Sequence, residues 1–188
     1  MLNVLVWECQ GFFAAVQAVD DALQQQLVPT LLFMRIQWAL DFAANVAKIL
    51  WARPRYEEER IARARALRLR RHVGITKNRT LAEVLNNTLL RNALEHVDAR
   101  LDSWGQTTMT FNLAMFNTGP KDMIVGLTDD ERFMEYDPAT HEIRMLRETL
   151  NLRTLSTNVR NVLQGAENAQ HVLRAAIFVP GHAPPAFP

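Results

Sequence analysis

The chain has 188 residues, of which 48% are hydrophobic and 22% charged, and its formal net charge at pH 7 is +1. This length suits one domain with a single core, and the composition excludes a disordered chain or a uniformly basic one. The single cysteine, Cys9, excludes an intrachain disulfide and is typical of a reducing compartment.

Three helices are predicted in the first 72 residues. Residues 8–26 have apolar residues at helical spacing and few breakers. Residues 29–52 begin at Pro29, which a first helical turn tolerates, and stop before Pro54. Residues 54–72 are predicted to form an arginine-rich helix that ends near Gly74.

Neither a leader nor a membrane span is expected. The N-terminus lacks the basic start of a signal peptide, and Glu8 interrupts its apolar run. Charged side chains also interrupt the longest apolar stretch, residues 27–52: Arg35, Asp41 and Lys48. We therefore expect a soluble cytoplasmic protein that does not enter a membrane.

A fourth helix is predicted from Thr80 to about Trp104. Thr80 and Glu83 have the Thr-x-x-Glu spacing of a capping box, which marks a helix start. Four long helices with short connections favour an antiparallel bundle.

The pattern changes after Gly105. Residues 122–127, 131–136 and 141–146 are short strand-like runs, and Asp137-Pro138-Ala139-Thr140 is a good turn between the last two. Helical spacing returns from Leu150 to about Ala176. The fold class is thus mainly α: an antiparallel four-to-five-helix bundle with a small antiparallel hairpin or three-stranded appendage before the last helix. We expect one domain over residues 1–179 with a β-containing insertion at about 106–147, and a Pro-rich irregular tail at 180–188.

The predicted fourth helix has two apolar stripes on opposite sides. The first contains Leu90, Leu94, Val97, Leu101 and Trp104, and the second contains Leu81, Leu85 and Leu89. Such a helix needs two partners, and a second copy of the chain is the simplest second one, so we predict a homodimer.

Arg91, Asn92 and His96 lie on this helix, and Asn92 and His96 continue its second stripe. Arginine binds phosphate and histidine transfers protons near neutral pH, a combination suited to phosphodiester cleavage without a metal. Arg91 and His96 are about 140° apart around the helix, which favours a site where the two groups meet across a dimer interface. The alternative is structural: Arg91 pairs with Glu95, and His96 is an interface histidine.

The run Arg91-Asn92-x-x-x-His96 resembles the signature of the HEPN superfamily of small helical bundles. Arg65 and His72 match a looser spacing, but Ala66 replaces the polar second residue, and we discount that pair. The resemblance implies a homodimeric, metal-independent endoribonuclease without a cofactor, of the kind found among toxins and defence components that a partner protein restrains. It does not account for the β-containing segment.

The resemblance assigns a role to each residue of the motif. His96 would act as general acid or base, Arg91 would hold the scissile phosphate, and Asn92 would orient either of them. The products would carry 2′,3′-cyclic phosphate ends. Four arginines of the basic helix would contact the RNA backbone: Arg60, Arg63, Arg68 and Arg71.

Two other interpretations stay open. The basic helix is equally well read as a solvated face balanced by Glu57, Glu58 and Glu59. Some HEPN members keep the fold without activity, so the alternative function is a non-catalytic dimeric module that binds a protein, nucleotide or nucleic acid. No histidine, cysteine and carboxylate spacing indicates a metal site, and no glycine-rich loop indicates a nucleotide cofactor.

Overall fold

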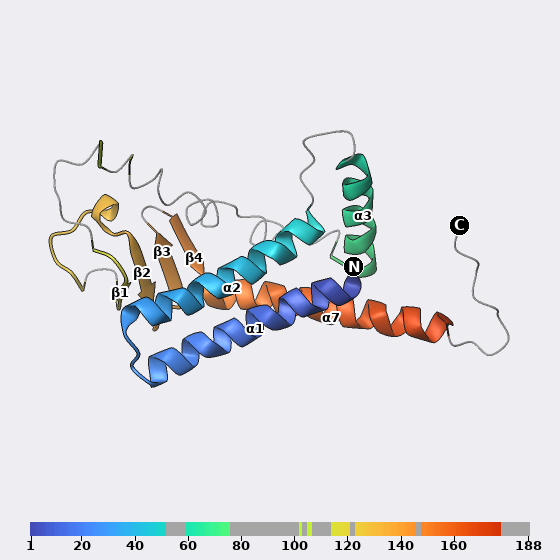
Figure 1. Cartoon of the computed structure of the whole chain (residues 1–188), viewed down its shortest axis with the longest axis horizontal. Coiled ribbons are helices and arrows are strands. Elements are labelled where there is room, and N and C mark those ends of the chain that lie inside the picture. The colour runs from blue at the N-terminus through green and yellow to red at the C-terminus, as the bar shows by residue number, and fades with distance from the viewer. Residues whose placement is uncertain are drawn as a thin grey trace.

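The computed structural model describes residues 1–51, 59–75, 102, 105–106, 114–120, 123–145 and 148–177. Over these residues the protein is mainly helical, with a small mixed sheet before the last helix (Figure 1). The four α-helices with named bounds are α1 (Leu2–Gln24), α2 (Pro29–Leu50), α3 (Glu59–His72) and α7 (Leu152–Ile177). The strands are β1 (Asn117–Thr118), β2 (Met134–Asp137), β3 (Glu142–Met145) and β4 (Glu148–Asn151), and a short 3₁₀ turn, η1, spans Asp129–Glu131.

The helices α1 and α2 form an antiparallel hairpin. Arg35 of α2 donates to the carbonyl oxygen of Ala18 at 2.7 Å, and Asn45 donates to Glu8 at 3.2 Å. The two backbones approach closely at Gly11, where an added Cβ would lie 2.3 Å from the Phe42 ring. The pair buries an apolar stripe from each helix, and these residues begin the core.

The last helix, α7, packs along the other side of α1 and runs antiparallel to it (Figure 1). Gln170 donates to Asn3 at 2.8 Å near one end of the contact. Further along, the Arg160 guanidinium lies 5.3 Å from the centre of the Phe13 ring. The three long helices therefore share one core, to which α7 contributes Leu155, Val159 and Val162.

The basic helix α3 stands across the ends of the other helices instead of lying along them (Figure 1). Helix α1 is antiparallel to both α2 and α7, whereas the predicted antiparallel arrangement is wrong for α3 (Figure 1). One cause is a close contact at Gly165 of α7, whose missing side chain leaves room for the Val73 carbonyl just beyond α3. The predicted helix over residues 80–104 lies almost entirely outside the described residues.

The sheet has four strands in the order β1-β2-β3-β4. Strand β1 pairs in parallel with β2, and β2, β3 and β4 are antiparallel, so the predicted purely antiparallel two- or three-stranded element is wrong in strand number and type. The predicted turn at 137–140 is confirmed, because β2 ends at Asp137 and β3 begins at Glu142. The predicted strand at 122–127 is wrong, since residues 123–126 form bends and turns. The tail at 180–188 lies beyond the described part of the chain.

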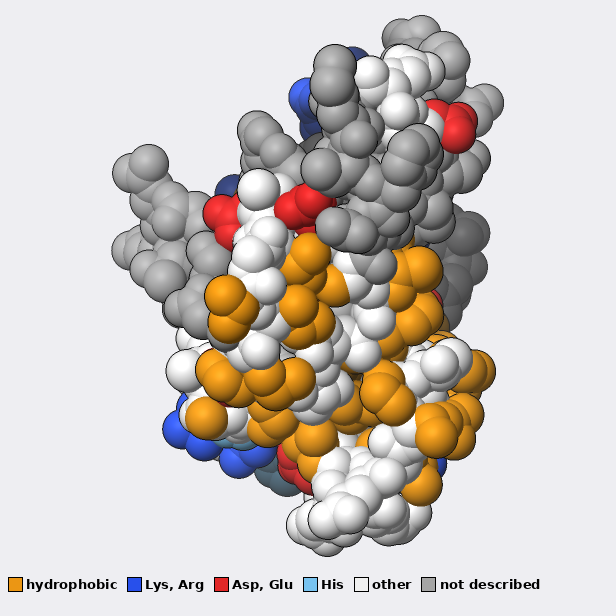
Figure 2. Space-filling view, turned by 90° about the vertical axis from the view of Figure 1, so that its left-hand side faces the viewer, with side chains coloured by type: hydrophobic (Ala, Val, Ile, Leu, Met, Phe, Trp, Pro, Cys, Tyr) orange, Lys and Arg blue, Asp and Glu red, His pale blue; other side chains and the backbone are white. Residues whose placement is uncertain are grey.

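Hydrophobic side chains gather on the surface of the end that carries the sheet and the α1–α2 turn (Figure 2). The ring centres of Phe33 and Phe116 lie 5.3 Å apart and join α2 to the segment before β1. The exposed large apolar residues of these segments are Val28, Leu31, Met34, Met115, Met123 and Val125, which we call the apolar end patch. Apolar surface of this kind is typical of a face that meets a partner.

Candidate functional site

The predicted catalytic residues Arg91, Asn92 and His96 all lie outside the described residues. Their mutual geometry and the predicted contact across a dimer interface therefore stay predictions. The candidate site that the structure does describe is the other predicted element, the basic helix α3.

Arginines cover the solvent side of α3. Arg60, Arg63, Arg68 and Arg71, the four predicted to contact nucleic acid, are all exposed, and so is Arg65. Residues 60–72 contain no acidic residue. In the sequence, Glu57, Glu58 and Glu59 directly precede this stretch. Positive charge is therefore concentrated along the rest of the helix.

Arg70 differs from these exposed arginines, because its side chain makes contacts that hold α3 in the fold. Its guanidinium donates to the carbonyl oxygen of Leu50 at 3.0 Å and lies 5.7 Å from the centre of the Trp51 ring. Burial lowers the pKa of Arg70 below its usual value. The carbonyl at the end of α2 and the cationic side chain together fix α3 in its crossed position.

The same helix borders an open depression of about 410 Å³. Its floor is apolar, and Arg65, Arg68 and His72 stand around it together with Met1, Ile61, Ala64 and Leu69. Counting about 100° per residue, Ile61, Arg65, Arg68 and His72 fall on one side of α3. Of the four predicted residues, only Arg68 borders the depression. The other three lie on the outward side and the opposite flank of α3: Arg60, Arg63 and Arg71.

The structure thus brings together Arg65 and His72, the pair that the sequence interpretation set aside. Their seven-residue spacing, two helical turns, was the available signal. The apolar floor between them was not predictable, because it includes Met1 from the start of α1.

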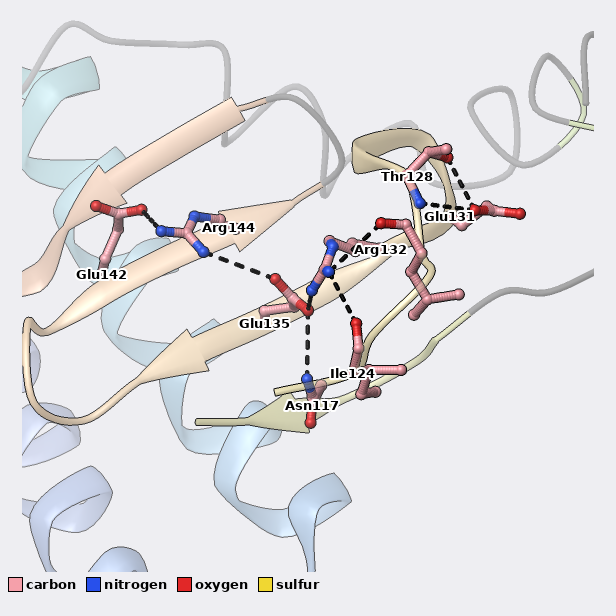
Figure 3. A network of polar contacts seen from close by, with 9 residues as sticks. Asn117, Ile124, Thr128, Glu131, Arg132, Glu135, Glu142 and Arg144 are labelled. Atoms are coloured by element: carbon pink, nitrogen blue, oxygen red, sulfur yellow. Dashed lines mark hydrogen bonds and ion pairs between the residues drawn. The ribbon is translucent and has the colours of Figure 1, made fainter. Parts of the chain in front are cut away.

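A second polar cluster lies in the sheet, centred on the carboxylate of Glu135 (Figure 3). Arg132 donates to Oε1 of Glu135 at 2.9 Å and Asn117 donates to the same oxygen at 3.3 Å. Arg144 lies 3.9 Å from Oε2 and pairs on its other side with Glu142. Glu135 is 2% exposed and Arg132 5% exposed, so this is a buried ion pair.

The buried arginine ties a loop to the sheet. Nη2 of Arg132 donates to the carbonyl oxygens of Ile124 at 3.0 Å and Leu127 at 3.4 Å (Figure 3). Beside it, Glu131 accepts from the backbone and hydroxyl of Thr128 at 2.7 and 2.9 Å, which forms a capping box around η1. The capping box gives Glu131 a structural role, and the whole cluster has the contacts of a structural network.

His141, which directly precedes β3, lies between the side chains of Tyr136 and Arg153. Its backbone φ is +58°, in the left-handed region. Nδ1 lies 3.4 Å from the Tyr136 hydroxyl, and Nε2 lies 2.8 Å from Nη2 of Arg153. Since a guanidinium only donates, Nε2 accepts and the proton of the neutral ring sits on Nδ1. Burial and the nearby Asp20 and Asp137 carboxylates raise the pKa of Tyr136 to about 12, so the phenol stays protonated.

Cys9 is unsuited to act as a nucleophile. The thiol is buried in the core, and burial together with Glu8 and Glu167 raises its pKa to about 12. Among the described residues no three histidine, cysteine or acidic side chains are placed to hold a metal ion.

These observations define a class: a mainly helical protein with a four-stranded mixed sheet and a cross-standing basic helix beside an apolar depression. No protein-family model matches the chain, and no match was found among curated proteins or solved structures. The HEPN resemblance therefore rests on the sequence motif of residues 91–96 and stays a prediction.

Proposed function

We propose that the protein binds RNA through the arginine face of α3. The observation that carries this proposal is the exposure of Arg60, Arg63, Arg65, Arg68 and Arg71 along a stretch without acidic residues. Guanidinium groups bind phosphates through paired hydrogen bonds. Several of them along one helix can contact successive phosphates of a nucleic acid, which a surface of mixed charge does not favour.

The test is the salt dependence of RNA binding, measured by fluorescence polarisation with a labelled single-stranded RNA. Replacing Arg60, Arg63 and Arg71 together by Gln removes three phosphate contacts, which lowers the slope of log affinity against log salt by about 2. The matched control is Arg174→Gln, an exposed arginine in the last turn of α7. An unchanged slope in the triple variant, or an equal loss in the control, contradicts the proposal.

We further propose that the bound RNA is cleaved without a metal, as in HEPN ribonucleases. The motif Arg91-Asn92-x3-His96 supports this step, with His96 as general acid or base, Arg91 on the scissile phosphate and Asn92 as the orienting group. An RNA-cleavage assay in EDTA tests it, with His96→Ala and Arg91→Ala as variants. Both variants lose cleavage while keeping the α3-dependent binding, and the wild type leaves 2′,3′-cyclic phosphate ends. A wild type that binds but does not cleave contradicts the catalytic step alone.

A specific observation favours the second candidate, a dimeric interaction module. Leu31, Met34 and Trp38 form a stripe on α2 and are 42%, 47% and 51% exposed. This stripe begins within the apolar end patch, and Trp7 of α1, 61% exposed, packs edge-on against Phe42 beside it. A second copy is the occupant we propose, since a twofold axis brings the same apolar stripe of each copy together. A restraining protein partner, as the HEPN resemblance implies, is the competing occupant.

A further inference from the structure

We propose that the depression beside α3 receives one unpaired nucleobase of the bound strand, so that the preferred ligand is single-stranded RNA. This inference rests on the proposed RNA binding and adds a specificity that phosphate contacts alone do not have. It starts from the position of Arg68, which belongs both to the arginine face and to the rim of the depression. A strand whose phosphates follow the arginine face therefore passes the mouth of the depression.

The residues that line the depression are suited to contact the flat ring of a nucleobase. Ile61, which is 76% exposed, offers an apolar surface together with Met1, Ala64 and Leu69. Arg65, Arg68 and His72 also line the depression, and their side chains end in planar groups of the kind that stack on bases. An apolar lining with two arginine side chains in it suits a base whose phosphate stays outside.

The shape of the depression favours a nucleobase as its ligand over an acyl chain or a duplex. A lipid tail needs an enclosed channel to remove its methylenes from water, whereas this depression is open to solvent. Duplex RNA keeps its bases stacked and paired, so that only phosphates and 2′-hydroxyls reach the protein. An open apolar depression next to phosphate-binding arginines is useful only to a strand whose bases can turn out.

The experiment compares two uncleavable probes of about twelve nucleotides, within the usual footprint of single-strand binding sites. One is a 2′-O-methyl single strand, and the other is an abasic strand with the same number of phosphates. We expect the wild type to bind the strand with bases at least about fivefold more tightly, since one stacked base contributes that much or more. Ile61→Ser removes this preference and leaves the affinity for the abasic strand unchanged.

Two further variants keep the test decisive. Arg65→Lys retains the charge but loses the planar group, so it lowers the affinity for the strand with bases by a larger factor than the affinity for the abasic strand. Leu67→Ser is the matched control, an exposed apolar residue on the other flank of α3, and it keeps the wild-type preference. The folded state of each variant is checked by its thermal unfolding.

Each remaining outcome has a separate meaning. Equal binding of both probes by the wild type overturns the nucleobase inference and leaves phosphate binding through α3 intact. Absence of binding to both probes overturns the proposed RNA binding itself. Release of the strand by anionic phospholipid vesicles, with vesicle binding lost in Ile61→Ser, assigns the depression to a lipid and also overturns the inference.

Discussion

Glu135 is the residue on which the polar cluster of the sheet depends. It accepts from Arg132 and Asn117 and lies near Arg144, while Arg132 ties down the loop at 124–127 (Figure 3). A buried pair of this kind adds little beyond what an apolar pair would contribute, but loss of one partner leaves the other charge buried without compensation. The cluster therefore fixes the loop against the sheet more than it raises stability.

This argument predicts a large effect of Glu135→Ala. The buried Arg132 loses its carboxylate, and the free energy of unfolding falls by about 3–5 kcal/mol in urea denaturation. The control is Glu142→Ala, which removes a more exposed partner of Arg144 and costs at most about 1 kcal/mol. Equal effects of the two substitutions would show that the Glu135 cluster is open to water.

Cys9 gives a prediction about reactivity. With a pKa of about 12, roughly one thiol in ten thousand is ionised at pH 8 in the folded protein. A disulfide reagent such as 5,5′-dithiobis(2-nitrobenzoate) is therefore expected to react at least about a thousandfold more slowly with the folded chain than with the urea-unfolded chain. The absorbance of the released thiolate measures both rates. Similar rates would place the thiol at the surface.

At the scale of elements, the described helices were predictable, although α1 begins at Leu2 and not at residue 8, and the sheet was only partly so. Helical spacing and the breakers Pro29, Pro54 and Gly74 mark α1, α2 and α3, and the spacing after Leu150 marks α7. The short strand β1 has two residues and pairs in parallel with β2, a partner distant in sequence. No periodicity can mark so short a strand, and its pairing depends on tertiary contacts. The predicted turn at 137–140 was correct because its residues determine it locally.

The contact between α3 and α7 predicts the effect of Gly165→Ala. An added Cβ would lie 2.2 Å from the Val73 carbonyl oxygen, and both groups belong to the backbone, so neither can turn aside. We expect the free energy of unfolding to fall by about 1–3 kcal/mol, although alanine is the better helix former by about 1 kcal/mol. Urea denaturation measures this change.

The neighbouring substitution Gln164→Ala is the control, because Gln164 is exposed on the same helix. It is expected to leave stability unchanged within about 0.5 kcal/mol. A more stable Gly165→Ala variant would contradict the close packing of α7 on the end of α3.

At the scale of the whole molecule, the candidate site was predictable only where one helix forms it. The arginine-rich helix α3 follows from residues 60–72 alone, and its four predicted arginines are exposed, while their contact with nucleic acid stays a prediction. The depression requires Met1 beside α3, which depends on how α1 and α3 pack. The predicted catalytic group, residues 91–96, lies outside the described part of the chain and stays a prediction.

The surface of the helical hairpin bears on where the protein acts. Among the described helices, α1 is long and apolar enough to cross a membrane, with 33% of its most apolar window buried. Core helices of soluble proteins and signal sequences meet the same criterion, so the cytoplasmic location stays a prediction. The apolar residues of α1 that face the core are explained by packing, whereas the exposed Trp7 and the stripe on α2 are not.

That exposed stripe leads to a prediction about assembly. A stable dimer covers about 800 Å² on each copy, and large aromatic side chains at the centre of such a contact contribute most of its affinity. Trp38 occupies the stripe between Met34 and Phe42 and is half-exposed in the single chain. Trp38→Ser is therefore expected to weaken dimerisation at least about tenfold, as measured by sedimentation velocity over a range of protein concentrations.

The control for this experiment is Val172→Ser, which removes a more exposed apolar side chain, 65% accessible, from α7. It lies outside the stripe and leaves the dimer unchanged. A wild type that stays monomeric at every concentration removes the dimer from the proposal, and the stripe then faces a different partner. A dimer that both substitutions leave intact is held by another surface. In that case the predicted helix at residues 80–104, with its two apolar stripes, becomes the next segment to test.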